Sequence, residues 1–199
     1  MIMVKKISDL ILCLALGIIL GITSKYLDTV AVDGGWITNV LHYLGDLFTR
    51  LGIWVWIATL VAAYSRTLRR AAINTFVVFI GMLLSYYIYS AYLFGFFPTS
   101  YFIRWGGIAL LSPLLAAVVW KAKHSERLAM ILPALPMGLL LSLSLSIGFF
   151  YIDLTHIEEL IMYVFLCVVF YKNPKQMIVS IGLSIIIAFI ICISPFFIL

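Results

Sequence analysis

The segment AINTFVVFIGMLLSYYIYSAYLFGFFPTSYFIRWGGIALLSPLLAAVVW, residues 72–120, decides the fold of this chain. Two apolar stretches, 72–94 and 102–120, lie on either side of the sequence Phe-Phe-Pro. An α-helix of about twenty apolar residues crosses the hydrocarbon core of a bilayer. Pro98 has no backbone N–H to continue a helix. The segment therefore predicts two membrane-spanning helices joined by a short hairpin loop.

The composition of the whole chain extends this prediction. Of its 199 residues, 65% are hydrophobic and only 11% are charged, whereas a soluble domain carries about 25% charged residues. A chain with so few charged residues is suited to a surface that faces lipid rather than water. The sequence predicts an all-α, multi-pass transmembrane helix bundle in which residues 1–199 form a single integral membrane domain.

Seven apolar stretches qualify as spans. They cover residues 7–24, 51–65, 72–94, 102–120, 128–150, 157–171 and 176–197. The second and sixth are the shortest, so a bundle of six spans is the alternative.

The sequence between the first two spans, WITNVLHYLGDLFTRLG at 36–52, is amphipathic. Its apolar residues recur at helical spacing and its polar residues fall on the opposite side. The apolar set is Val40, Leu41, Leu44, Leu47, Phe48 and Leu51, and the polar set is Asn39, His42, Asp46 and Arg50. This pattern predicts a helix that lies along the outer membrane surface.

The distribution of charge predicts the orientation. If the N-terminus is cytoplasmic, seven spans leave ten of the basic residues inside, and only Lys25, Arg50 and Arg104 outside. This is the bias that orients membrane proteins. The acids Asp28, Asp33, Asp46, Asp153, Glu158 and Glu159 then lie outside. We expect a cell-membrane protein with a cytoplasmic N-terminus and an external C-terminus.

The net charge of +5 does not predict a nucleic-acid partner, because the basic residues are dispersed between the spans. Cys13, Cys167 and Cys192 lie in apolar stretches without metal-binding spacing, and no cofactor or metal site is expected. Small residues recur at four-residue steps, as in Gly17 and Gly21, which is typical of close helix packing. The same spacing occurs at Gly138, Ser142 and Ser146, and at Ser180, Ser184 and Ala188.

Arg104 is the candidate ligand anchor. It lies beside the hairpin loop among ten aromatic residues of the stretch 85–107. A guanidinium group binds an anionic group through two parallel hydrogen bonds, and aromatic walls suit such a site. The candidate walls are Tyr86, Tyr87, Tyr101 and Trp105. In the alternative interpretation, Arg104 extends toward the lipid headgroups and the rings form an interfacial aromatic belt.

A second candidate pocket lies where prolines interrupt the predicted spans. Pro113, Pro133 and Pro136 each free a backbone carbonyl, and broken helices line sites in transporters. Ser112 and Asn74 would provide its polar lining. Ordinary helix kinks are the alternative.

The central part of the chain resembles a family of small bacterial multi-pass membrane proteins of unknown function. The resemblance covers residues 52–125 and rests on motifs within the second, third and fourth spans and in the turns between them. These are Trp54 to Trp56, Ser65-Arg66, Gly81-Met82, Ser85-Tyr86-Tyr87, Phe96-Phe97-Pro98, Ser112-Pro113 and Trp120-Lys121. It implies a multi-pass helical architecture and transfers no activity. In size and helix number only, the chain also resembles the substrate-binding subunits of energy-coupling-factor transporters.

Three functional hypotheses follow. The first is a non-enzymatic membrane protein that binds a small molecule or lipid in its outer half, as a transporter subunit would. The second is an accessory or structural protein that acts through a membrane protein partner. The third is an intramembrane enzyme, which the sequence disfavours because it contains no HExxH motif and no pair of aspartates within a span.

Overall fold

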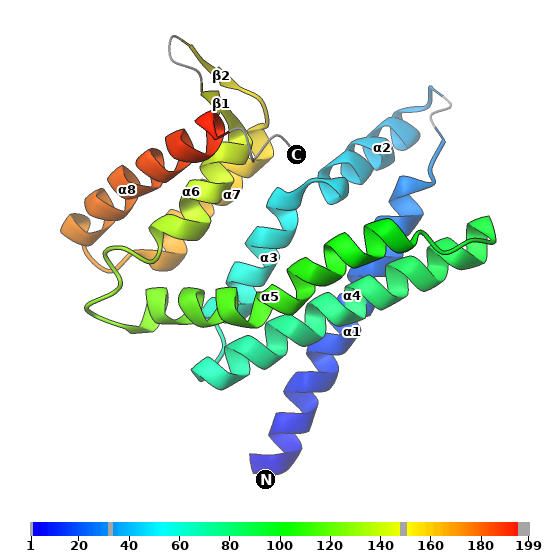
Figure 1. Cartoon of the computed structure of the whole chain (residues 1–199), viewed down its shortest axis with the longest axis horizontal. Helices are drawn as coiled ribbons and strands as arrows, with labels where there is room; N and C mark the ends of the chain where they lie inside the picture. The colour runs from blue at the N-terminus through cyan, green and yellow to red at the C-terminus, as the bar shows by residue number, and fades with distance from the viewer. Residues whose placement is uncertain (1, 32–33, 148–150, 195–199) are drawn as a thin grey trace. The chain divides into compact units, whose positions relative to one another are not determined.

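A computed structural model describes residues 2–31, 34–147 and 151–194, with side chains described from Ser8 onward. These residues are predominantly α-helical, and among them lies one short β-hairpin (Figure 1). The helices are α1 (Ile2–Asp28), α2 (Trp36–Thr49), α3 (Leu51–Ala63), α4 (Leu68–Phe94), α5 (Thr99–His124), α6 (Ala134–Ser144), α7 (Ile157–Phe170) and α8 (Pro174–Ile193). The strands β1 (Leu145–Ile147) and β2 (Ile152–Leu154) pair antiparallel.

Among the described residues, four helices are long and apolar enough to cross a membrane, namely α1 from Ser8 onward, α4, α5 and α8. Helices α2 and α3 pass the same test as a pair, but the chain bends by 68° between them. The apolar helices support a membrane-embedded helical protein, as the sequence predicts.

The chain divides into two compact units. Unit 1 comprises Met1–Leu51 and Ser65–Ala117, and unit 2 comprises Gly52–Tyr64 and Val118–Leu199. Helices α3 and α5 contribute residues to both.

In unit 1, α1 packs directly on α4 along the predicted glycine face. A Cβ on Gly17 would collide with the carbonyl oxygen of Val78, and one on Gly21 with the carbonyl oxygen of Met82. Both pairs are separated by the same 61 residues that separate Asp9 from its partner Arg70. A constant offset means that the two helices run parallel. The predicted role of these glycines in helix packing is confirmed.

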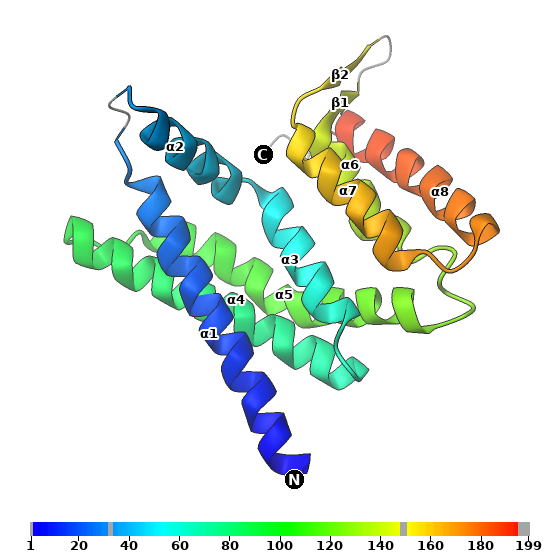
Figure 2. The same ribbon diagram turned by 180° about the vertical axis from the view of Figure 1, so that it is seen from behind.

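Helices α4 and α5 form the hairpin predicted from residues 72–120. Gly95 ends α4 with φ +70°, a left-handed conformation that glycine adopts at little cost. The ring of Tyr87 lies 5.4 Å from that of Phe102, and a Cβ on Gly106 would lie 3.9 Å from Leu83. The helices therefore run antiparallel, and Figures 1 and 2 show them side by side.

Helix α2 corresponds to the amphipathic stretch, but its burial follows the predicted faces only in part, because Val40 of the apolar set is 49% exposed and Arg50 of the polar set is half-buried. Leu41, Leu44 and Phe48 are partly buried, whereas His42 and Asp46 are exposed. The backbone at Arg50 is extended, which ends α2 before α3 begins.

In unit 2, α6 and α8 run parallel through a seam of small residues. A Cβ on Gly138 would lie 2.7 Å from Ile187 Cγ2, and Ser180, Ser184 and Ala188 are fully buried. Helix α7 reverses direction and packs on α8, where the Tyr163 hydroxyl lies 3.0 Å from Ser184 Oγ. This confirms packing roles for Gly138 and the α8 residues, whereas Ser146 lies exposed in β1.

The predicted helix over 128–150 is wrong at both ends. Residues 128–133 form turns, and α6 begins only at Ala134, with Pro133 at its N-cap. Proline is tolerated there because first-turn N–H groups have no helical partner. Beyond Ser144 the chain enters the β-hairpin, and the Ser144 carbonyl accepts hydrogen bonds from the N–H groups of Thr155 and His156.

The other predicted segments coincide with helices whose ends shift by a few residues. Glu158 and Glu159 lie in the first turn of α7, where negative charge is favourable. The predicted ends of the fifth span, 148–150, and of the seventh, 195–197, lie outside the described residues, as does Asp33.

Candidate ligand-binding site

Arg104 lies on the second turn of α5 and is exposed. Its guanidinium carbon lies 5.8 Å from the centre of the Tyr101 ring, one helical turn earlier. This contact is a cation–π pair within a single helix. Two of the predicted site residues therefore come together here.

Tyr86 turns toward α1 and takes part in a polar cluster. Its hydroxyl donates to the Asp28 carboxylate at 3.0 Å. The Lys25 ammonium group donates to the same carboxylate oxygen at 2.7 Å. Lys25 is only 6% exposed, and its ammonium group also lies 5.1 Å from the Tyr86 ring and 4.8 Å from the Phe94 ring. We call Lys25, Asp28, Tyr86 and Phe94 the lysine cluster.

Tyr87 belongs to an aromatic group that closes the hairpin. It is 4% exposed, and its ring lies 5.8 Å from Phe97 and 5.4 Å from Phe102. The Phe97 and Phe102 rings are themselves 5.1 Å apart, edge to face. Edge-to-face packing places a positive ring edge on a negative ring face and stabilises the turn. Tyr87 is thus part of the packed hairpin. Its ring contacts that of its neighbour Tyr86 edge to face at 5.0 Å, and the Tyr86 hydroxyl links the hairpin to Asp28 of α1.

The register of α4 and α5 puts the Arg104–Tyr101 pair at a level similar to that of the lysine cluster. Arg104 lies between Phe102, which packs on Tyr87, and Gly106, which faces Leu83. Arg104 is therefore level with the part of α4 that carries Tyr86, and Tyr86 contacts Asp28. The accessible charges at this depth are the exposed guanidinium of Arg104 and the Asp28 carboxylate, whose side chain is 34% exposed.

The remaining predicted residues lie elsewhere. Trp105 is half-buried beside Arg104, whereas Ser112 is buried and its hydroxyl donates to the Ala109 carbonyl one turn earlier. Asn74 donates to Ser65 Oγ at 3.4 Å. It precedes Tyr86 by twelve residues, about 18 Å along the helix. The structure therefore does not bring Asn74 to the level of Arg104.

Lys25 and Asp28 are the residues that sequence reasoning missed. Their i, i+3 spacing allows an ion pair on one helix face. A lysine at the apolar end of a span was the available signal, since such charges are costly without a partner. Only the parallel packing of α1 on α4 adds Tyr86 and Phe94 to the pair.

No group of three or more His, Cys, Asp or Glu side chains that could hold a metal ion occurs within the part of the chain that the structure describes. No protein-family model, curated protein or solved structure matches this chain.

Proposed function

We propose that this chain is a non-enzymatic, multi-pass protein of the cell membrane that binds a lipid headgroup in the outer half of unit 1. The observation that carries the proposal is the exposed Arg104–Tyr101 pair at the level of the lysine cluster. Arginine suits a phosphate, because its planar donors match the phosphate oxygens. The partly exposed Asp28 carboxylate suits the amine of a zwitterionic headgroup.

We further propose seven spans, with a cytoplasmic N-terminus, an external C-terminus and α2 along the outer surface. Within unit 1, α5 runs antiparallel to α1 and α4, and within unit 2, α7 runs antiparallel to α6 and α8. These directions support the proposed topology. Two ion pairs on α1, Asp9–Arg70 and Lys25–Asp28, also support the topology, because Asp9 and Lys25 lie about 24 Å apart along the helix. That spacing approaches the thickness of the hydrocarbon core. Helices α3, α6 and α7 are shorter than a full span, and protein packing would have to satisfy their non-helical ends. We also propose that this chain is related to the small bacterial multi-pass membrane proteins that residues 52–125 resemble.

The experiment that tests the outer site is native mass spectrometry of the purified protein with phosphatidylethanolamine added at defined ratios. The Arg104→Ala variant should bind this lipid about 10- to 150-fold more weakly, because a charge-assisted hydrogen bond contributes about 1.5–3 kcal/mol. Arg104→Lys should recover only part of the affinity, since lysine lacks the planar fork.

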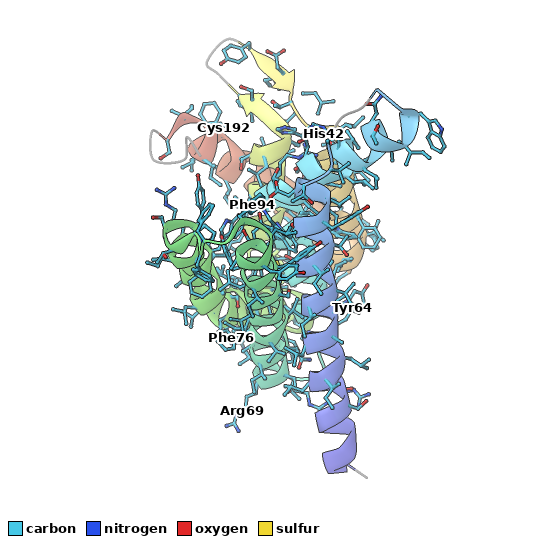
Figure 3. All side chains as sticks on the ribbon, turned by 90° about the vertical axis from the view of Figure 1, so that its right-hand side faces the viewer. His42, Tyr64, Arg69, Phe76, Phe94 and Cys192 are labelled. Atoms are coloured by element: carbon cyan, nitrogen blue, oxygen red, sulfur yellow. The ribbon has the colours of Figure 1, made fainter. Side chains whose placement is uncertain are left out.

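Arg69→Ala is the matched control, because it removes the same charge from an exposed residue of the first α4 turn, where Figure 3 shows the side chain projecting away from the ribbon. Equal lipid affinity in the wild-type protein and Arg104→Ala would exclude Arg104 as the anchor. An Asp28→Asn variant that binds phosphatidylethanolamine as tightly as the wild-type protein would exclude Asp28 as the partner of the headgroup amine.

A further inference from the structure

A second charged surface lies in unit 2 and is independent of the outer site. Two stretches of sequence, 121–127 and 172–175, follow the ends of α5 and α7 and carry five basic residues against one acid, Glu126. The basic residues are Lys121, Lys123, Arg127, Lys172 and Lys175. We call these five residues the basic collar.

The two stretches form one surface because hydrogen bonds join them. The Lys172 ammonium group donates to the Ser125 carbonyl at 3.1 Å. Immediately beyond, Gln176 Nε2 donates to the Ala129 carbonyl at 2.8 Å, and Gln176 is 2% exposed. Contacts between residues 47 positions apart thus hold the charges of both turns together. The general bias of basic residues toward the cytoplasmic side of a membrane would not require hydrogen bonds between the two turns.

Aromatic rings accompany the charges, as is usual at the level of lipid headgroups. The Lys123 ammonium group lies 3.5 Å from the centre of the Tyr64 ring, and Tyr64 is 66% exposed. The His124 ring stacks on Trp120 at 4.5 Å. Tyr171, next to Lys172, is 55% exposed.

The position of the basic collar along the helices also matches the level of the lipid headgroups. It lies at the C-terminal end of α5 and at the N-terminal end of α8, two helices that are long and apolar enough to cross a membrane. The first turn of α8 contains no acidic residue, so the positive end of its helix dipole adds to the collar. Clusters of four to eight basic residues beside a span are typical of sites for anionic lipids.

We propose that the basic collar binds the phosphate groups of anionic phospholipids in the leaflet that contacts the α5–α6 and α7–α8 turns. Anionic lipids fit better than zwitterionic ones because the collar offers cations with only Glu126 among them to pair with an amine. The exposed Arg127 and Lys175 are the residues to vary, because the structure uses Lys172 and Lys123 in contacts within the unit.

The test is a titration of the purified full-length protein with phosphatidylglycerol and, separately, phosphatidylcholine of the same acyl chains, with bound lipid counted by native mass spectrometry. The wild-type protein should prefer phosphatidylglycerol. The double variant Arg127→Gln, Lys175→Gln should bind it about 25-fold more weakly, because each basic residue near a membrane surface contributes roughly fivefold to affinity.

Two controls separate a localised site from general electrostatics. Lys5→Gln with Lys6→Gln removes the same charge from the N-terminal part of α1 in unit 1 and should leave phosphatidylglycerol binding within about twofold. Arg127→Lys with Lys175→Arg keeps the charge and should keep the preference. Equal binding of both lipids to the wild-type protein would overturn the proposal. Equal losses in the two glutamine double variants, or loss in the charge-preserving variant, would also overturn it.

Discussion

Gly17 of α1 packs against the carbonyl oxygen of Val78 of α4, so closely that no side chain fits between the two helices. The same offset of 61 residues joins Asp9 to Arg70. It also joins Lys25 to the Tyr86 ring. One parallel contact line therefore carries an ion pair near its start, glycines at its centre and the lysine cluster at its end.

The first prediction concerns this glycine contact. Gly17→Ala should lower the free energy of unfolding by about 1–3 kcal/mol, because the new methyl group meets backbone that cannot rotate away. Thermal denaturation in detergent measures the effect. Gly107→Ala is the control, since nothing lies within 4 Å of a Cβ there. Equal melting temperatures for the two variants would contradict the packing.

The second prediction concerns the ion pair between α1 and α4. Arg70 Nη1 lies 2.9 Å from Asp9 Oδ2, with both side chains partly exposed. A double-mutant cycle of Asp9→Asn and Arg70→Gln should give a coupling energy of about 0.5–1 kcal/mol, in the range of accessible pairs. The coupling should decrease as salt is added. Additive effects of the two substitutions would show that the pair contributes nothing.

The third prediction concerns Gln176, which holds the turn after α5. Gln176→Leu should cost about 1–3 kcal/mol, because the buried Ala129 carbonyl then keeps only the 3.5 Å hydrogen bond from Ser180 Oγ. Trypsin should then cleave faster after Arg127, which lies in the released turn. Limited proteolysis followed by mass spectrometry locates the cut. Ser142→Ala is the comparison, since that hydroxyl bonds only within its own helix turn.

The fourth prediction concerns orientation. In a chain whose cysteines are replaced by alanine, Ser100→Cys should react with a membrane-impermeant thiol reagent on intact cells. Glu126→Cys should react only after the membrane is opened. Both native residues are exposed, so access depends on membrane side rather than burial. Labelling of Glu126→Cys on intact cells would contradict the proposed topology.

Much of the architecture was predictable from the sequence, because apolar length and helical periodicity are local properties. The hairpin of residues 72–120, the helix of 36–49 and the glycine face of α1 all follow from them. The helix expected over 128–150 did not, because periodicity does not show where Leu145 leaves α6 and pairs with Leu154.

The candidate site was also only partly predictable from the sequence. The sequence alone determined an apolar helical chain with its rings and Arg104 beside one loop. Only the tertiary structure decided that Tyr86 points to Asp28 and Lys25, while Arg104 remains exposed above Tyr101. The physical reason is that a buried ammonium group must be paired, and Asp28 of the same helix is joined here by the Tyr86 and Phe94 rings of α4. Parallel packing across 61 residues supplied them.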